Sequence, residues 1–494
     1  MLHEGGAMDA SLPQVQVAWG PMLPLLLLTG TGLLVLVLDP LMAPEHRDRL
    51  PILSLAGVLA AALAVVLGWD RTEIGFGGML AGDGFARFFS LLFLLVAALT
   101  LLISVAYIRR AGMDHGEYSA LLLFGTLGMM VMASSLDLMT IFLGLETLSI
   151  SLYILAGFLR EDLKSNESAL KYLLLGAFAS GFLLYGIALV YGATGSINLT
   201  RVAAALSSGQ VRSPALLTLG MGLLIVGFGF KVASVPFHMW APDVYEGAPT
   251  SVTAFMITGT KAAAFAAFLR ILMTGLPALL PDWSGVLWVL AVLSMTVGNL
   301  VALAQTNLKR MLAYSSIAHA GYLLVATVTG TRLGSGSILF YLTAYTFMNL
   351  GAFAVIVALA RRDEERLLID EYAGLGRRHP LLAAAMALFM FSLAGVPPTA
   401  GFMGKLYVFG AAIQGDYLGL AIIGVVNSVI SAFYYLRITV VMYMTPGEAE
   451  PAPASLSPAL LLAVAIAAWG TLQLGLFPSR FLEIALRSVG ALLG

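Results

Sequence analysis

The chain has 494 residues, of which 60% are hydrophobic and 11% are charged, and its formal net charge is −1. Soluble proteins carry about 25% charged residues, so this composition excludes an ordinary soluble enzyme and predicts a polytopic membrane protein with short loops. The lack of cysteine excludes disulfides, iron–sulfur clusters and thiolate metal sites in the chain. Because no phosphate loop, hydrolytic constellation or metal-ligand spacing occurs, we expect no cofactor or metal of its own and no nucleic-acid partner.

Apolar segments predict an all-α membrane fold of about fourteen transmembrane helices, because each crossing needs roughly 20 mostly apolar residues. After an exposed tail at 1–20, the spans are expected at 21–42, 51–69, 86–108, 118–135, 137–159, 168–193, 214–235, 249–273, 284–305, 308–328, 336–360, 380–412, 418–444 and 457–477. The fourth and fifth spans lie so close together that a tight hairpin must join them. The run 361–379 is the largest predicted loop, and 445–456 is a Pro/Glu-rich linker.

The basic residues of the loops predict an orientation. One side collects Arg109, Arg110, Arg160, Lys309 and several further arginines, whereas the loops of the other side carry fewer. Because the side richer in Lys and Arg is cytoplasmic in most membrane proteins, an even number of spans places both termini on the opposite side.

The stretch VGFGFKVASVPFHMWAPDVYEGAPTSVTAFMITGTK predicts a broken helix near 231–240. Lys231 precedes the break at Pro236, and Lys261 lies inside the next apolar helix. Ionisable groups at this depth usually mark an ion pathway, and a broken helix is tolerated there only inside protein or beside a wet cavity. We therefore expect the function to lie around this stretch.

A second interrupted span, FSLAGVPPTAGFMGKLYVFGAA, is broken near 394–402 by Pro397 and Pro398 and carries Lys405. Two interrupted helices in corresponding halves point to an internally repeated transporter fold. We predict a three-helix segment at 21–108 and two inverted five-helix repeats, at 118–273 and 284–444. A last transmembrane helix is predicted at 457–477.

Glu146 lies in the middle of the fifth span with no basic residue near it in sequence, and Lys231 is its natural partner. A desolvated lysine gives up its proton more easily, and an adjacent carboxylate opposes this effect. The pair is therefore either a proton-responsive switch or a fixed structural salt bridge.

Four further ionisable groups are candidates, each with a structural alternative. Lys261 and Lys405 either take part in proton transfer or snorkel to an interface. Lys171 forms a favourable helical pair with Glu167, four residues earlier, and it either takes part in proton transfer or serves only in this pair. His319 is either a proton relay or a hydrogen-bonded core histidine.

Other polar residues near these candidates are harder to assign. His238, Asp243 and Glu246 follow the first break, where they either cap the turn or admit protons. Arg310 is best explained as an anchor on the basic side of the membrane. Arg437, in the thirteenth span, has no partner that the sequence indicates.

Five stretches resemble the antiporter-like membrane subunits of respiratory complex I, the bacterial NADH–quinone oxidoreductase. They are FLGLETLSISLYILAGF, SNESALKYLLLGAFASGFLLYGIALVYGATGSINL, KVASVPFHMWAPDVYEGAPTSVTAFMITGTK, NLKRMLAYSSIAHAGY and LAGVPPTAGFMGK. The third and fourth stretches are highly specific to the superfamily, and the likeness covers roughly 20–480. The second stretch and the number of spans favour the subunit N branch.

This resemblance implies a proton-translocating subunit in which Glu146, Lys171, Lys231, Lys261, His319 and Lys405 form a hydrated polar axis. It also implies that NADH, flavin, iron–sulfur clusters and quinone are handled by other subunits. The implied partners are antiporter-like subunit M, the small subunits J and K, lipid, protons and water. The implied location is the bacterial plasma (inner) membrane, with both termini periplasmic.

Two alternatives stay open at this point. The chain resembles subunits of multisubunit cation/proton antiporters, which share the same motifs. It is also compatible with a membrane scaffold that does not pump, although a scaffold has no reason to bury several lysines.

Overall fold

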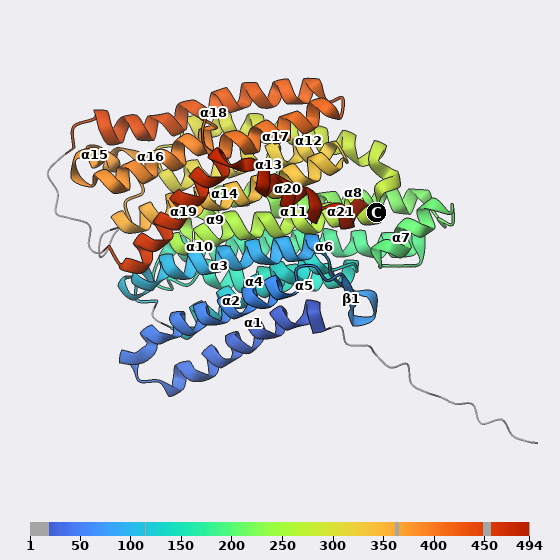
Figure 1. The fold of residues 1–494 in the computed structure, drawn as a ribbon, viewed down its shortest axis with the longest axis horizontal. Coiled ribbons are helices and arrows are strands. Elements are labelled where there is room, and N and C mark those ends of the chain that lie inside the picture. Colours follow the sequence, from blue (N-terminus) through green and yellow to red (C-terminus); the bar gives the residue numbers. More distant parts are fainter. Residues whose placement is uncertain (1–18, 114, 361–364, 448–455, 494) are drawn as a thin grey trace, which may run out of the picture.

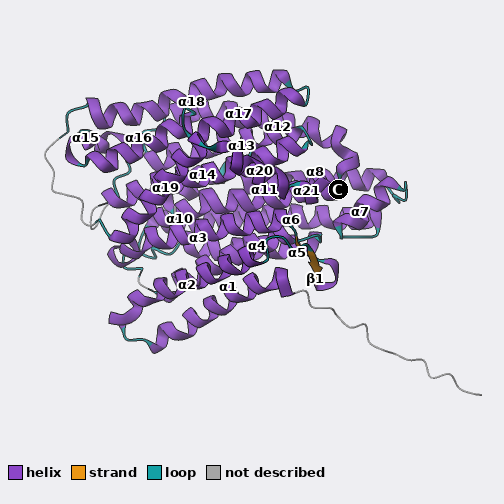
Figure 2. Ribbon diagram, in the orientation of Figure 1, coloured by secondary structure: helices purple, strands orange, loops and turns teal. Residues whose placement is uncertain are grey.

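The computed structural model describes residues 19–113, 115–360, 365–447 and 456–493, and most of them are helical (Figures 1 and 2). Thirteen helical stretches in this described part are long and apolar enough to cross a membrane. A broken helix made of α16 and α17 supplies a further crossing, so the predicted all-α polytopic fold is confirmed. The N-terminal tail and parts of the two predicted loops, at 361–364 and 448–455, lie outside the described residues.

The N-terminal segment forms one edge of the molecule, coloured blue in Figure 1. Its helices are α1 (Trp19–Leu38), α2 (Leu50–Leu67) and α3 (Gly84–Arg110). Between α2 and α3 the chain forms a short antiparallel hairpin, β1 (Glu73–Gly75) and β2 (Leu80–Gly82), in which Glu73 pairs with Gly82. Helices α1 and α2 keep most of their apolar surface exposed, as expected for helices that face lipid.

Ten spans follow in two sets with the same order of elements. The first four members of the first set are α4 (Gly116–Ser134), α5 (Leu138–Ala156), α6 (Leu163–Thr194) and α8 (Pro214–Val232) with α9 (Trp240–Gly247). The fifth member is one long helix with four parts. They are α10 (Thr250–Phe255), a π-helical turn η4 (Met256–Thr260), α11 (Lys261–Arg270) and a second π-helical turn η5 (Ile271–Gly275). The second set is α12 (Leu280–Leu303), α13 (Leu308–Val328), α14 (Arg332–Leu359), α16 (Pro380–Ala394) with α17 (Ala400–Gln414), and α18 (Leu418–Met444). In both sets the fourth member is the broken helix.

Shorter helices connect or follow these spans. They are α7 (Leu199–Ser207), α15 (Leu375–Arg378), α19 (Pro458–Leu476), α20 (Pro478–Ser488) and α21 (Gly490–Leu493). Of these, α19 is long enough to cross a membrane, as predicted for the last span. Helix α20 packs against α3 and α14 and so links the C-terminal region to the N-terminal segment and to the second set of spans.

Local sequence explains how the helices start and stop. The tight hairpin predicted between the fourth and fifth spans is present, because Asp137 accepts hydrogen bonds from the backbone N–H groups of Met139 and Thr140 and so caps α5. Helix α8 ends where Ala233 takes a left-handed conformation with φ of 57°. Helix α16 ends at Gly395, which has a φ of 89° that glycine adopts without strain.

The centre of the molecule is formed by α10–η5, α13 and α14, which are almost completely buried by other helices. At the edges, α1, α2 and α18 are exposed over most of their length. Helix α14 packs against α10, η4 and α13. The residues carried by these central helices, among them Lys261 and His319, therefore lie far from lipid.

Candidate functional site

Lys231 occupies the last turn of α8 and is 4% exposed. Its ammonium group donates a hydrogen bond of 2.6 Å to the hydroxyl of Ser149 on α5. The same group faces the rings of Tyr172 and Tyr153, with distances to the ring centroids of 5.4 and 5.9 Å. Neutral groups therefore hold this cation by a hydroxyl contact and by cation–π contacts.

Glu146, the suggested partner of Lys231, lies on the same helix as the direct contact of the lysine. The Glu146 carboxylate accepts a hydrogen bond from the Ser180 hydroxyl of α6, while Lys231 contacts Ser149, three residues further along α5. Residues three apart lie on the same face of a helix. The carboxylate and the ammonium are thus neighbours on one face of α5, with Ser149 as the direct partner of the lysine.

The break after α8 is closed by Trp240, the first residue of α9. Its indole N–H donates to the carbonyl of Phe230 at 3.0 Å, and its ring stacks on Tyr172 with centroids 4.7 Å apart. The indole is a second donor to this carbonyl, which also accepts a hydrogen bond from the backbone N–H of Ala233. The break is consequently a defined structural feature that fixes the surroundings of Lys231.

Lys261 begins α11, directly after the π-helical turn, and is 2% exposed. Its ammonium donates to the carbonyl of Val232 at 3.1 Å and to the carbonyl of Ser316 at 2.7 Å. Val232 is the residue next to Lys231, and Ser316 belongs to α13. This burial rules out snorkelling and places Lys261 between the end of α8 and the second half of the molecule.

Lys405 is the counterpart of Lys261 at the second break. It donates to the carbonyls of Leu393 and Ala394, at 3.1 and 2.8 Å, and to the hydroxyl of Ser428 at 2.8 Å. It lies over the ring of Tyr322 at 5.1 Å from the centroid. Lys405 is buried and does not snorkel either. At each break, then, a lysine ammonium binds open carbonyls at the end of the broken helix.

His319 is fully enclosed by α13, α14 and α18. Its Nδ1 atom hydrogen-bonds to the hydroxyl of Tyr341 at 2.6 Å and its Nε2 atom to the hydroxyl of Tyr435 at 2.9 Å. The Tyr435 hydroxyl also contacts Ser315. This geometry is that of a hydrogen-bonded core histidine, and it is also the geometry of a relay, because each hydroxyl can both accept and donate a proton.

Lys171 lies apart from the buried lysines. Its ammonium forms the predicted ion pair with Glu167 at 2.7 Å and a second pair with Asp243 of α9 at 2.7 Å. Arg310 of α13 binds Asp243 at 2.8 Å and Glu246 at 3.0 Å. Asp243, Glu246 and Arg310 therefore connect α9 to α6 and α13, and Arg310 is more than an anchor.

Several buried hydroxyl groups near the lysines have no hydrogen-bond partner within the described part of the chain. They belong to Tyr153 and Tyr172 beside Lys231, to Thr260 and Ser316 beside Lys261, and to Tyr345 beside His319. Buried polar groups are nearly always satisfied by protein or by ordered water. These oxygens mark a polar lining that runs beside the lysines through both halves.

Comparison with known proteins identifies the family. A family model described as "NADH:quinone oxidoreductase/Mrp antiporter, TM" matches residues 135–431. The chain is 52% identical over 467 residues to a protein of Trichlorobacter lovleyi named "NADH-quinone oxidoreductase subunit N", covering 94% of this chain and 96% of that one. The chain belongs to the subunit N family of NADH–quinone oxidoreductase.

Solved structures agree with this assignment to the subunit N family. A chain of respiratory complex I from Thermus thermophilus with bound aureothin has 39% identity and a TM-score of 0.80, covering 94% of this chain and 99% of that chain. A chain of the Mrp complex from Dietzia sp. has 23% identity and a TM-score of 0.83, covering 97% and 98%. The Mrp likeness shows a shared fold alone.

One buried ion pair of this subunit N family member was missed by the sequence reasoning. Arg270, near the end of α11, is 1% exposed and binds Asp83 through two hydrogen bonds of 2.9 Å. Burial alone would raise the pKa of Asp83, but the Arg270 guanidinium holds it below its usual range. An arginine near the end of an apolar span was the available signal.

Two other features had weaker signals in the sequence. Arg437, which had no assigned partner, donates to the carbonyl of Gln305 at 3.2 Å. The tyrosines around His319 look like ordinary core aromatics in sequence, since nothing local marks their hydroxyl contacts. Only the packing of α13, α14 and α18 brings these groups together.

Proposed function

We propose that this chain is a proton-translocating membrane-arm subunit of NADH–quinone oxidoreductase, respiratory complex I. The observation that carries the proposal is the set of three buried lysines, Lys231, Lys261 and Lys405, held by hydroxyls, carbonyls and aromatic rings instead of carboxylates. A charge buried without a counter-charge is costly to keep in one state. That property is expected of side chains that load and release protons.

The contacts support an order for the proton path. Lys261 binds the carbonyl next to Lys231, and its second contact, Ser316, lies three residues before His319. His319 continues through Tyr435 to Ser315 and through Tyr341 to α14. These contacts would thus join Lys231, Lys261, His319 and Lys405 into one path.

Glu146 is proposed as the controlling carboxylate. Its charge lies on the same face of α5 as Ser149, which holds Lys231, so protonation or movement of Glu146 changes the field at the lysine. Moving one charge against 100 mV takes about 2.3 kcal/mol. A change of roughly two units in a lysine's proton affinity supplies this energy, because one unit is about 1.4 kcal/mol.

Lys171 is proposed to act at the periphery of this path. It shares Asp243 with Arg310, so it ties the broken helix half α9 to the first and second sets of helices. Its part in translocation would be to hold α9, and with it the Lys231 region, in position.

The redox chemistry is assigned to the other subunits. NADH, flavin, iron–sulfur clusters and quinone would bind there, and this chain would contribute to the oxidoreductase without a redox centre of its own. The neighbours we infer in the membrane arm are antiporter-like subunit M and the small subunits J and K. The complex would lie in the bacterial plasma (inner) membrane, with both termini of this chain in the periplasm.

The test is Lys231→Ala in the intact, assembled complex. We expect proton uptake driven by NADH oxidation in membrane vesicles to fall severalfold or more, because one of the three lysines of the path is lost. Arg487→Ala is the control, since Arg487 is an exposed cation whose only role is a surface ion pair with Glu483, away from the lysines. Unchanged pumping by a fully assembled Lys231→Ala complex would remove this lysine from the path.

The same experiment addresses the two other readings. A scaffold subunit would tolerate Lys231→Ala without loss of pumping. A cation/proton antiporter would require Na⁺ or another cation in exchange, and the support for it is at the level of fold, at 23% identity to the Mrp chain. The 52% identity to a subunit N favours complex I.

A further inference from the structure

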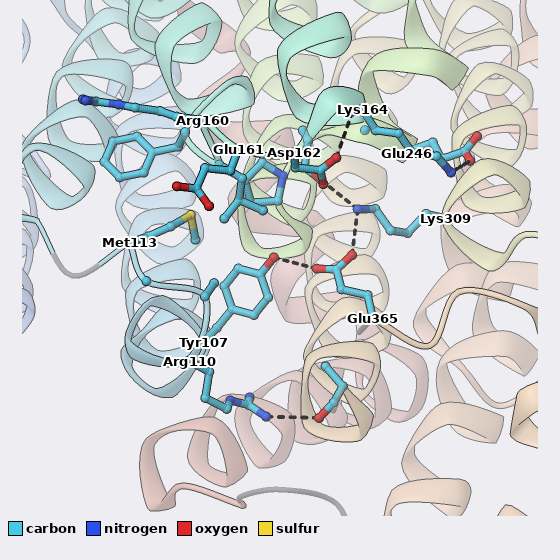
Figure 3. A pocket seen from close by; sticks show the side chains of 18 of the residues that line it. Tyr107, Arg110, Met113, Arg160, Glu161, Asp162, Lys164, Glu246, Lys309 and Glu365 are labelled. Atoms are coloured by element: carbon cyan, nitrogen blue, oxygen red, sulfur yellow. Dashed lines mark hydrogen bonds and ion pairs between the residues drawn. The ribbon is translucent and has the colours of Figure 1, made fainter. Parts of the chain in front are cut away.

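A pocket of about 960 Å³ opens at the ends of α3, α5 and α13, beside the connection from α9 to α10 (Figure 3). It lies among the loops that carry most of the basic residues. Side chains of both signs line it, namely Arg110, Arg160, Lys164 and Lys309 together with Glu161, Asp162, Glu246 and Glu365. A water molecule needs only about 10–15 Å³ of such space, so this vestibule has room for many.

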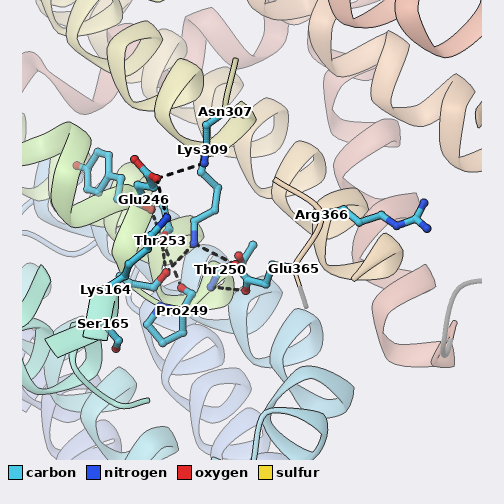
Figure 4. Close-up of polar contacts among 12 residues, drawn as sticks. Lys164, Ser165, Glu246, Pro249, Thr250, Thr253, Asn307, Lys309, Glu365 and Arg366 are labelled. Atoms are coloured by element: carbon cyan, nitrogen blue, oxygen red, sulfur yellow. Dashed lines mark hydrogen bonds and ion pairs between the residues drawn. The ribbon is translucent and has the colours of Figure 1, made fainter. Parts of the chain in front are cut away.

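The inner wall of the vestibule carries a buried lysine paired with a carboxylate, Lys309 and Glu365 (Figure 4). Lys309 is 1% exposed and donates to the carbonyl of Ala248 at 2.7 Å and to Glu365 at 3.3 Å. Ala248 lies between α9 and α10, the helix that continues to Lys261. The pair is therefore attached to the connection between the two lysine-bearing elements of the first half.

Glu365 is the member of the pair that meets the vestibule, with 24% of its side chain exposed. Its Oε1 atom accepts hydrogen bonds from the Tyr107 hydroxyl at 2.5 Å and from the backbone N–H of Thr250 at 3.4 Å. Burial would raise the pKa of this carboxyl, but Lys309 and the two hydrogen bonds hold it below its usual range. The carboxylate is thus ionised and open to protons from water.

Buried polar oxygens lead from this pair toward Lys261. The side-chain oxygens of Thr250 and Asn349 have no partner within the described part of the chain, and the hydroxyls of Tyr345 and Ser316 face each other. They belong to α10, α14 and α13, and α14 packs against the other two. Each would cost about 1–3 kcal/mol if left dry, which indicates a polar passage here.

The geometry of α13 gives this passage a direction. Lys309 and Ser316 are seven residues apart, so they lie on the same face of the helix and about 10 Å apart along its axis. The carbonyl of Ser316 binds Lys261 at 2.7 Å. One face of α13 therefore spans the distance from the vestibule to the central lysine.

We propose that Glu365 is the proton-collecting carboxylate of this chain and that it passes protons from the vestibule to Lys261. This inference rests on the proposed function and adds to it the residue that takes up the proton. Lys309 is the positioning residue, because it holds Glu365 against the start of α10 and favours the departure of a bound proton.

Proton uptake by Glu365 and transfer to Lys261 take place in two steps. Hydronium in the vestibule gives a proton to a Glu365 oxygen and becomes water, and the ion pair to Lys309 is broken while Lys309 stays on Ala248. The proton then leaves Glu365 along the hydroxyls of the passage and forms a new N–H bond on the unprotonated amine of Lys261. Glu365 returns to the carboxylate and again pairs with Lys309.

The test is Glu365→Gln in the assembled complex, with Glu161→Gln as the matched control. Both residues line the vestibule, but Glu161 is exposed and is not part of the Lys309 pair. We expect Glu365→Gln to slow NADH-driven proton uptake by at least about tenfold, or about 1.4 kcal/mol on the barrier, and Glu161→Gln to leave it unchanged. Equal rates in the two variants would overturn the proposal.

A second comparison separates proton transfer from mere ion pairing. Glu365→Asp keeps a carboxylate, whereas Glu365→Cys modified with a sulfonate-bearing thiosulfonate restores a negative charge that does not take up a proton near neutral pH. The chain has no cysteine of its own, so the label has one target in this subunit. The proposal predicts that aspartate restores NADH-driven proton uptake and that the sulfonate does not. Equal proton uptake in the two variants would show that Glu365 acts only as a structural partner of Lys309.

Lys261→Ala, measured in the same assay, separates a failure of the Glu365 uptake route from a failure of the proposed function. Loss of pumping in Lys261→Ala with normal pumping in Glu365→Gln would leave the proposed function intact and overturn the uptake route. Normal pumping in both would overturn the proposed function itself.

Discussion

The buried cations of this chain fall into two kinds according to what holds them. Arg270 binds the carboxylate of Asp83 through two hydrogen bonds, so its charge is permanently compensated. Lys231, Lys261 and Lys405 are held by hydroxyls and carbonyls. The first arrangement suits a fixed structural tie between α3 and α11, and the second suits groups that change their protonation.

The structural role of the Asp83–Arg270 pair predicts the effect of Asp83→Asn. Removing one partner of a buried pair leaves the other charge uncompensated and costs about 3–5 kcal/mol. We expect the heated complex to lose this chain at a lower temperature than the wild type, whereas Asp70→Asn, at an exposed position before α3, changes little. Equal thermal stability of the two variants would contradict this role.

The same pair has a defined pH dependence. The pKa of Asp83 is lowered in the folded chain, so the pair stabilises the fold above the pKa of an unfolded aspartate. This contribution disappears as the pH falls through the lowered pKa. The difference in stability between wild type and Asp83→Asn is therefore expected to shrink in acid.

At the scale of elements, the two broken helices were predictable from prolines inside apolar runs. Their partners were not, because Lys261 and Lys405 bind carbonyls at the ends of other helices. Glu146, the partner that the sequence suggests for Lys231, is likewise not the direct contact of the lysine. The hydroxyl of Ser149 accepts the hydrogen bond from Lys231. The sequence does not show which residue on a helix face will contact a side chain from a distant segment.

The second break depends on a close approach of α17 to α16. A Cβ at Gly401 would collide with the backbone carbonyl of Ser392, whereas a Cβ at Gly410, on the same helix, would meet no atom within 4 Å. We expect Gly401→Ala to displace Lys405 and to lower assembly and pumping. Gly410→Ala should be neutral or slightly stabilising, by about 0.5–1 kcal/mol, and equal behaviour of the two variants would argue against a tightly packed break.

At the scale of the whole molecule, the all-α fold and its long apolar spans followed from hydropathy alone. The β1–β2 hairpin, α7 and the π-helical turns at the two ends of α11 could not be predicted from hydropathy. Short elements and a register change of one residue leave no periodic signal. The vestibule was equally hidden, since its wall combines residues from α3, α13 and the loops after α5 and α14.

The arrangement of the whole chain also explains why the site is central. The helices that carry Lys261 and His319 are covered on all sides, while α1, α2 and α18 form the exposed edges (Figure 1). Protons can reach such a centre only along polar groups inside the protein. The unpaired hydroxyls beside the lysines and the vestibule on the basic side are the features that meet this need.

The most direct test of the central claim is the number of protons pumped per electron pair by the intact complex in sealed vesicles, compared between wild type and Lys261→Ala at equal content of assembled complex. Lys261 is the link between the two halves, through Val232 and Ser316. We expect Lys261→Ala to lower the number of protons pumped per electron pair, or to stop NADH oxidation together with pumping. An unchanged proton yield at an unchanged rate of NADH oxidation would contradict it.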